Sequence, residues 1–129
     1  MMSIKDYVDE IITRGIEAAR NDYIANDPLT KAKLEGSIEG FEACRNKEPH
    51  EILSLFEKAR RESGRLHVEE PDINLYWKVS CKAAEIEWVA NCVSAAFVNQ
   101  GLPPLIPPTV RGMMQAARIL GVKDASPVV

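Results

Sequence analysis

The sequence predicts an all-α fold: one domain, residues 1–129, in which about five helices pack around a long fourth helix. Prolines and glycines divide the chain into segments, and within the segments apolar residues recur at helical spacing. The longest run free of both breakers, 72–100, contains both tryptophans and two of the three cysteines. Predicted helices cover about three quarters of the residues, far above the usual third.

The first predicted helix ends and a second begins near residue 27. Ser3 is a suitable N-cap, and apolar residues recur on one face from residue 4 to about residue 26. Asp27 then suits the N-cap of a second helix over 28–46, and Pro28 suits its first position, where a missing N–H costs nothing.

Small residues form a stripe along the second helix: Ala32, Gly36, Gly40 and Ala43. A glycine inside a helix costs roughly 1 kcal/mol relative to alanine. Two glycines four positions apart therefore predict that another helix packs closely against this face.

The third helix is predicted over 49–63, with Gly64 as its C-terminal stop and a loop over 65–71. Its apolar residues are those expected to face the core: Ile52, Leu53, Leu55, Phe56 and Ala59.

The central helix should begin after Asp72, as N-cap, and end at Gly101. Its first half carries a polar stripe, whereas residues 86–98 are apolar nearly all round. A helix of that kind is buried on most sides. We therefore expect the other helices, or a second copy of the chain, to enclose this stretch.

Four prolines in LPPLIPP, residues 102–108, exclude a helix there. The segment predicts either a stiff connector that packs its leucine and isoleucine on the body, or a polyproline surface for a partner. A final helix is predicted over 109–120, and the tail over 122–129 is expected to be disordered.

The composition favours a cytoplasmic protein. The net charge of −3 argues against nucleic-acid binding by the whole surface, although it leaves room for a basic patch. Three cysteines without a CxxC pair fit reduced thiols. The N-terminus lacks the pattern of a signal peptide, and no apolar run approaches the roughly 18 residues of a membrane span.

Three carboxylates share one face of the second helix: Glu35, Glu39 and Glu42. Such a row suits Mg²⁺ or Mn²⁺, and with Glu69 and Asp72 it imitates the E-x-x-E…E-x-x-D pattern of all-helical nucleotide pyrophosphohydrolases. However, a proline precedes the last carboxylate and breaks the expected helix. A solvated face paired with lysine and arginine is the alternative, and no metal or other cofactor is expected.

Glu87 and Asn91 lie four positions apart on the central helix, on one polar seam with Ser80 and Ser94. A carboxylate in apolar surroundings can act as an acid or base. The seam can equally be a hydrogen-bonded feature that fixes helix register. His50 and His67 lack a zinc-ligand spacing, and Cys81 and Cys92 read as small core residues.

The most basic stretch contains Lys58, Arg60, Arg61 and Arg65. It can meet nucleic-acid phosphates, or it can be the solvated end of a helix. No P-loop, dinucleotide-binding, nucleophile-elbow or zinc-protease motif is present in the sequence.

One run, LEGSIEGFEACRNKEPHEILSLFEKA over residues 34–59, resembles a segment of small uncharacterised helical proteins encoded by phages and prophages. The similarity lies in EGFEACR, the following lysine and the helix that begins at Pro49. The resemblance implies a phage or prophage origin and supplies no site residues.

These observations favour a non-enzymatic protein that binds itself or another protein. The expected interface uses large apolar residues of the last two helices: Trp88, Val89, Phe97, Met113 and Met114. The alternatives are a nucleic-acid-associated regulator that uses residues 58–65 and a metal-dependent nucleotide hydrolase that uses the second-helix carboxylates.

Overall fold

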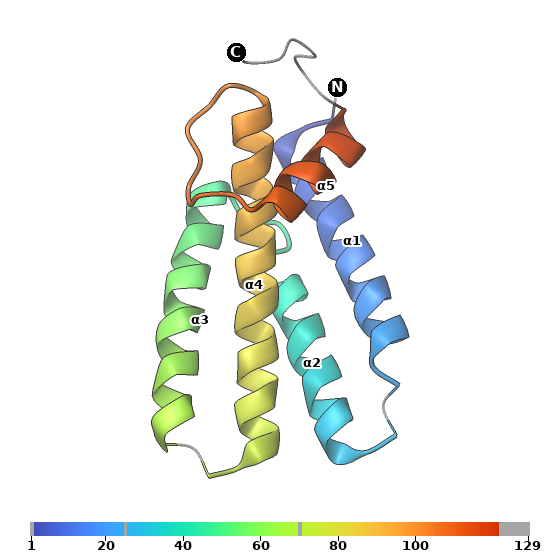
Figure 1. Cartoon of the computed structure of the whole chain (residues 1–129), viewed down its shortest axis with the longest axis vertical. Coiled ribbons are helices and arrows are strands. Elements are labelled where there is room, and N and C mark those ends of the chain that lie inside the picture. The colour runs from blue at the N-terminus through green and yellow to red at the C-terminus, as the bar shows by residue number, and fades with distance from the viewer. Residues whose placement is uncertain (1, 25, 70, 122–129) are drawn as a thin grey trace.

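The computed structural model describes residues 2–24, 26–69 and 71–121. Within them the chain forms five helices and no strand, so the predicted all-α bundle is confirmed (Figure 1). The helices are α1 (Ile4–Asp22), α2 (Pro28–Ala43), α3 (Pro49–Glu69), α4 (Ile73–Asn99) and α5 (Val110–Leu120).

Helix α4 is the centre of the bundle, as predicted. It packs against each of the other four helices, and α1 also packs on α2. Figure 1 shows α3 and α2 running along α4, with the short α5 lying across its C-terminal half beside α1. None of the described helices combines the length and the apolar character needed to cross a bilayer.

The predicted N-caps are confirmed by side-chain hydrogen bonds. Ser3 Oγ accepts from the backbone N–H of Asp6 at 3.1 Å, and Asp27 Oδ1 accepts from that of Thr30 at 2.8 Å. Asp72 Oδ1 accepts from the N–H of Asn74 at 2.9 Å, which fixes the start of α4. Each cap satisfies a backbone donor that the first helical turn leaves unpaired.

Three predicted helix ends are wrong. Helix α2 ends at Ala43 rather than at residue 46. Helix α3 does not stop at Gly64 but continues to Glu69, because Leu66 is 7% exposed and its burial offsets the cost of the glycine. Helix α1 ends at Asp22 rather than near residue 26. Ile24 beyond it is 75% exposed, so a longer helix would bury no further apolar side chain.

The second half of α4 is enclosed by the chain itself. Ile86 and residues 89–96 are all buried. Tyr7 of α1 reaches this core and donates its hydroxyl to the carbonyl oxygen of Cys92 at 2.9 Å, so its polar end is satisfied. The bundle therefore buries its central helix without a second copy.

The stripe of small residues on α2 lies directly against the backbone of α4, which confirms the predicted close packing of another helix. A Cβ atom on Gly36 would overlap the carbonyl oxygen of Lys78, and one on Gly40 would be 2.5 Å from that of Lys82. Because backbone atoms cannot move aside as a flexible side chain can, only glycine permits this approach.

Gly36→Ala should lower the free energy of unfolding by at least about 1–3 kcal/mol, because the added methyl group forces α2 away from α4. Gly64→Ala is the matched control, since a Cβ there meets no atom within 4 Å. It should raise stability by roughly 0.5–1 kcal/mol through helix propensity alone. Urea unfolding followed by circular dichroism measures both, and equal effects would contradict the close contact.

Candidate functional site

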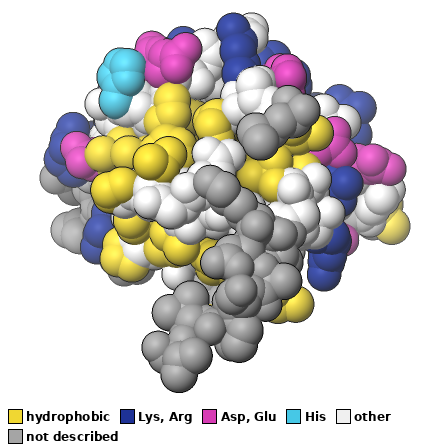
Figure 2. Space-filling model, turned by 90° about the horizontal axis from the view of Figure 1, so that it is seen from above, with side chains coloured by type: hydrophobic (Ala, Val, Ile, Leu, Met, Phe, Trp, Pro, Cys, Tyr) yellow, Lys and Arg dark blue, Asp and Glu magenta, His cyan; other side chains and the backbone are white. Residues whose placement is uncertain are grey.

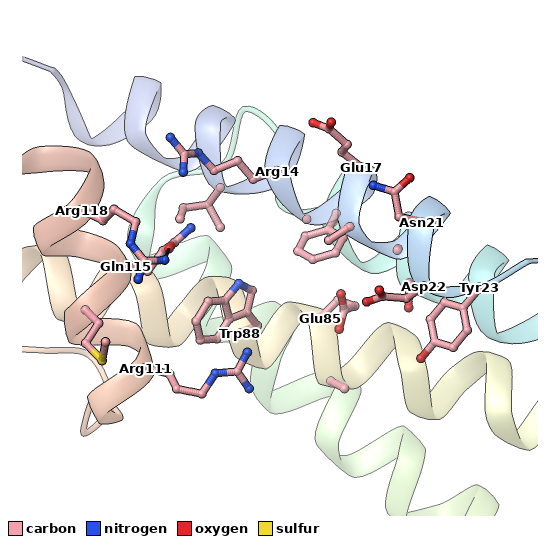
Figure 3. A pocket seen from close by; sticks show the side chains of 18 residues that line it. Arg14, Glu17, Asn21, Asp22, Tyr23, Glu85, Trp88, Arg111, Gln115 and Arg118 are labelled. Carbon is pink, nitrogen blue, oxygen red and sulfur yellow. Dashed lines mark hydrogen bonds between the residues drawn. The ribbon is translucent and has the colours of Figure 1, made fainter.

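A cleft of about 830 Å³ lies between α1, α4 and α5, and α2 supplies its floor (Figure 3). Its position follows from the bundle, because α5 covers only one end of the space between α1 and α4. The cleft is lined by charged, aromatic and other large side chains from these four helices and from Tyr23 at the end of α1. They include Arg14, Asp22, Tyr23, Phe41, Glu85, Trp88, Arg111, Met114, Gln115 and Arg118.

One end of the cleft is cationic. Arg14 of α1 and Arg111 and Arg118 of α5 reach it from opposite walls (Figure 3). Arg14 is paired with Glu10 at 2.8 Å on the exposed side of α1. The two α5 guanidinium groups form no ion pair with a described residue, so this end keeps a net positive charge.

The Trp88 indole forms the wall beside these guanidinium groups. The Arg111 guanidinium lies over the indole ring, 5.5 Å from its centroid. This cation–π contact holds the arginine against the wall while leaving its N–H groups available. Deeper in the cleft a Cβ on Gly15 would overlap the Phe41 ring, so the glycine lets that ring lie beneath α1.

The other end of the cleft is acidic. Figure 3 shows the carboxylates of Glu85 and Asp22 turned toward one another, with the Tyr23 hydroxyl beside them. Neither carboxylate accepts a hydrogen bond or forms an ion pair within the described part of the chain. Burial raises the pKa of the Glu85 carboxyl to about 7 and also raises the pKa of the Tyr23 phenol, to which nearby Cys81 adds.

The cleft is therefore dipolar, with an aromatic wall between a cationic and an acidic end. Such a site suits a ligand that carries both charges, because each end stabilises the opposite charge. A carboxyl group with a pKa near 7 can also exchange a proton at physiological pH.

The predicted interface residues divide between this cleft and the core. Trp88 and Met114 line the cleft, and Met114 is 54% exposed. Val89, in contrast, is 0% exposed and belongs to the chain's own core, so it is unavailable to a partner. Phe97 and Met113 are partly buried and pack against that core.

The α2 carboxylates are held in ion pairs with Lys78 and Arg45. Glu35 and Glu39 lie 3.8 and 3.2 Å from Lys78 Nζ, and Glu42 pairs with Arg45 at 2.7 Å. No three acidic, histidine or cysteine side chains in the described ranges are grouped so as to hold a metal ion. Two further carboxylates complete the E-x-x-E…E-x-x-D pattern. The Glu69 side chain lies outside the described residues, and Asp72 is the N-cap of α4.

The polar seam of α4 has a structural role. Asn91 Oδ1 accepts from the Thr109 N–H at 3.1 Å, and Ser94 Oγ accepts from the Ile106 N–H at 3.1 Å. These bonds hold the proline-rich connector on α4, and Leu105 and Ile106 pack on the core as expected of a connector. Glu87 is exposed and takes no part in this seam.

The remaining candidates stay apart from the cleft. Lys58, Arg60, Arg61 and Arg65 are exposed on α3, as is His50, whereas the His67 side chain lies outside the described residues. The Cys92 thiol is buried, which raises its pKa to about 12 and disfavours the reactive thiolate, and the same holds for Cys44.

Apolar side chains are also gathered at one end of the bundle. Figure 2 shows that end from above; it is the end at which the connector joins α4 to α5. Val98 is 38% exposed there and Leu102 is 50% exposed. This surface is separate from the charged cleft.

The sequence patterns did not indicate that Glu85 of α4 shares a cleft with Arg111 and Arg118 of α5. Glu85 belongs to the polar stripe in the first half of α4. Such a stripe predicts solvent exposure, whereas Glu85 is only partly exposed. Periodicity identifies the helix face that carries Glu85, but not that α1 and α5 cover part of that face.

The chain matches no protein-family model, and neither the curated proteins nor the solved structures searched contain a match. The cleft must therefore be interpreted from its own chemistry.

The free energy of unfolding should fall as pH rises from about 4.5 through about 7. Burial raises the Glu85 pKa from 4.5 to about 7 in the folded chain, so the folded state binds more protons than the unfolded state in this window. Glu85→Gln should remove this contribution, making the variant more stable relative to wild type at pH 8 than at pH 5.

Urea unfolding of both proteins at the two pH values measures that difference. Glu87→Gln, which removes an exposed carboxyl from the same helix, is the control and should keep the wild-type dependence. A Glu85→Gln variant with the same pH dependence as wild type would show that Glu85 is not desolvated.

Proposed function

We propose that this chain is a non-enzymatic protein-interaction module and that its partner docks in the cleft between α1, α4 and α5. The observation that carries the proposal is the composition of that cleft. It joins Trp88, Tyr23 and Met114 to three arginines around one concave surface. Tryptophan, tyrosine and arginine are the residues most enriched among those that dominate binding energy at protein interfaces.

The partner we assign to the cleft is another protein rather than a second copy of this chain. The sequence favours self-association because residues 86–98 are apolar nearly all round. Because α4 is buried there by the chain's own helices, that argument no longer requires an oligomer.

The two alternative functions lack a comparable site. The α2 carboxylates are held in ion pairs with Lys78 and Arg45. The basic side chains of α3 are exposed but lie outside the cleft, in a chain of net charge −3. Nucleic-acid binding through residues 58–65 and a phage or prophage origin stay predictions.

Selection of a displayed random dodecapeptide library on the immobilised chain tests the proposal. Ala84 lines the cleft and is itself exposed, so Ala84→Trp fills the cleft without entering the core. We expect the enriched peptides to bind this variant at least about tenfold more weakly, a loss of about 1.4 kcal/mol.

Thr13→Trp is the matched control, because Thr13 is exposed on α1 and does not line the cleft. It should bind the same peptides with an affinity close to that of wild type. A library that yields no peptide, or only peptides that bind Ala84→Trp as tightly as wild type, would exclude the cleft as a protein-docking site.

A further inference from the structure

We propose that the cleft recognises a partner by the order of its charges: an extended segment places an acidic side chain between Arg111 and Arg118 and a basic side chain beside Glu85. This inference rests on the proposed function and specifies the chemistry of the partner. It follows from the two ends of the cleft and the distance between them.

The cationic end is built for a carboxylate. Arg111 and Arg118 extend from the same helix, and Figure 3 shows both on the α5 side of the Trp88 indole. Arg118 Nη1 donates to Gln115 Oε1 at 3.4 Å, a weak contact that a charged acceptor can replace. Guanidinium groups bind carboxylates through paired N–H donors. Positions 111 and 118 lie about two turns apart on one face of α5, so an acidic side chain placed between them can contact both.

The acidic end offers a place for a cation. Several small residues line the cleft together with Glu85: Gly15, Ala18, Ala19, Ser37 and Ala84. They leave room beside a half-buried carboxylate that no described residue pairs. An ammonium or guanidinium group placed there restores the charge stabilisation that burial removes.

The negative carboxylate of Asp22 also faces this space (Figure 3), which makes a cation a better occupant than a neutral donor. The Tyr23 hydroxyl lies at the same end and can accept a hydrogen bond from the incoming group. Three side chains, from α4 and from the C-terminal end of α1, therefore lie at one end of the cleft.

The length of the cleft sets the spacing of the two charges. Arg14 and Asp22 mark its cationic and acidic ends along α1, and they lie eight positions apart, or about 12 Å along the helix axis. An extended chain advances roughly 3.3 Å per residue. The acidic and basic residues of the partner should thus be about three or four positions apart, with the intervening residues crossing Trp88.

The test repeats the dodecapeptide selection on wild type, on the double variant Arg111→Gln/Arg118→Gln and on Glu85→Gln. Peptides enriched by wild type should share one acidic and one basic residue at that spacing and in one order. Peptides selected on the double variant should lose the acidic residue but keep the basic one. Peptides selected on Glu85→Gln should lose the basic residue but keep the acidic one.

Matched controls are Arg60→Gln/Arg61→Gln on α3 and Glu87→Gln on α4, which remove the same charges from exposed positions outside the cleft. Both should return the wild-type pattern. Circular dichroism checks that each variant is folded, and Asp22→Asn, at an exposed position, tests the acidic end independently of Glu85.

The outcomes separate this inference from the proposed function. Selected peptides that bind wild type but bind Ala84→Trp weakly, and that share no fixed order of charges, would overturn the inference. The cleft would remain a docking site. The same holds if the charge variants return the wild-type pattern. If no selected peptide loses affinity for Ala84→Trp, the inference and the proposed function are both overturned.

Discussion

The approach of α2 to the backbone of α4 is the constraint on which the rest of the fold depends. At Gly36 and Gly40 there is no room for a side chain between the two helices. This contact places Phe41, one residue beyond Gly40, in the core. It also brings Glu35 and Glu39 within reach of Lys78, so the closest contact is flanked by ion pairs at the surface.

A second consequence of this packing is the shape of the molecule on its other side. With α2 and α3 held along α4, the exposed strip of α4 is left for α1 and the short α5. Two helices of unequal length cannot cover it completely, and the uncovered part is the cleft. The charges of the cleft are tolerated because that part of α4 remains in contact with water, while the neighbouring Ile86 and Val89 are buried.

Local patterns predicted the helices well because caps and periodicity depend on residues close in sequence. Ser3, Asp27 and Asp72 begin helices as their side chains predict, and the glycines of α2 correctly indicated a close partner. Gly64 misled the prediction, since the burial of Leu66 outweighs a local stop signal. The cleft required knowledge of which helices meet: Glu85 and Arg118 are far apart in sequence, and no spacing rule relates them. Trp88 and Met114 were predicted as interface residues, but the sequence did not show that Arg111, Arg118 and Glu85 line the same cleft.

The attachment of α5 has a consequence for how this protein can change. Only Gly112 and Ala116 of α5 are buried, and its start is held by Asn91 of α4 through Thr109. A Cβ on Gly112 would overlap the Asn91 side chain, so a larger residue at 112 would displace Asn91 Oδ1 from its hydrogen bonds with Thr109. The outward positions of α5 carry no such restriction. Substitutions there cost little folding free energy, so the side chains that α5 presents to the cleft can change while the bundle stays the same.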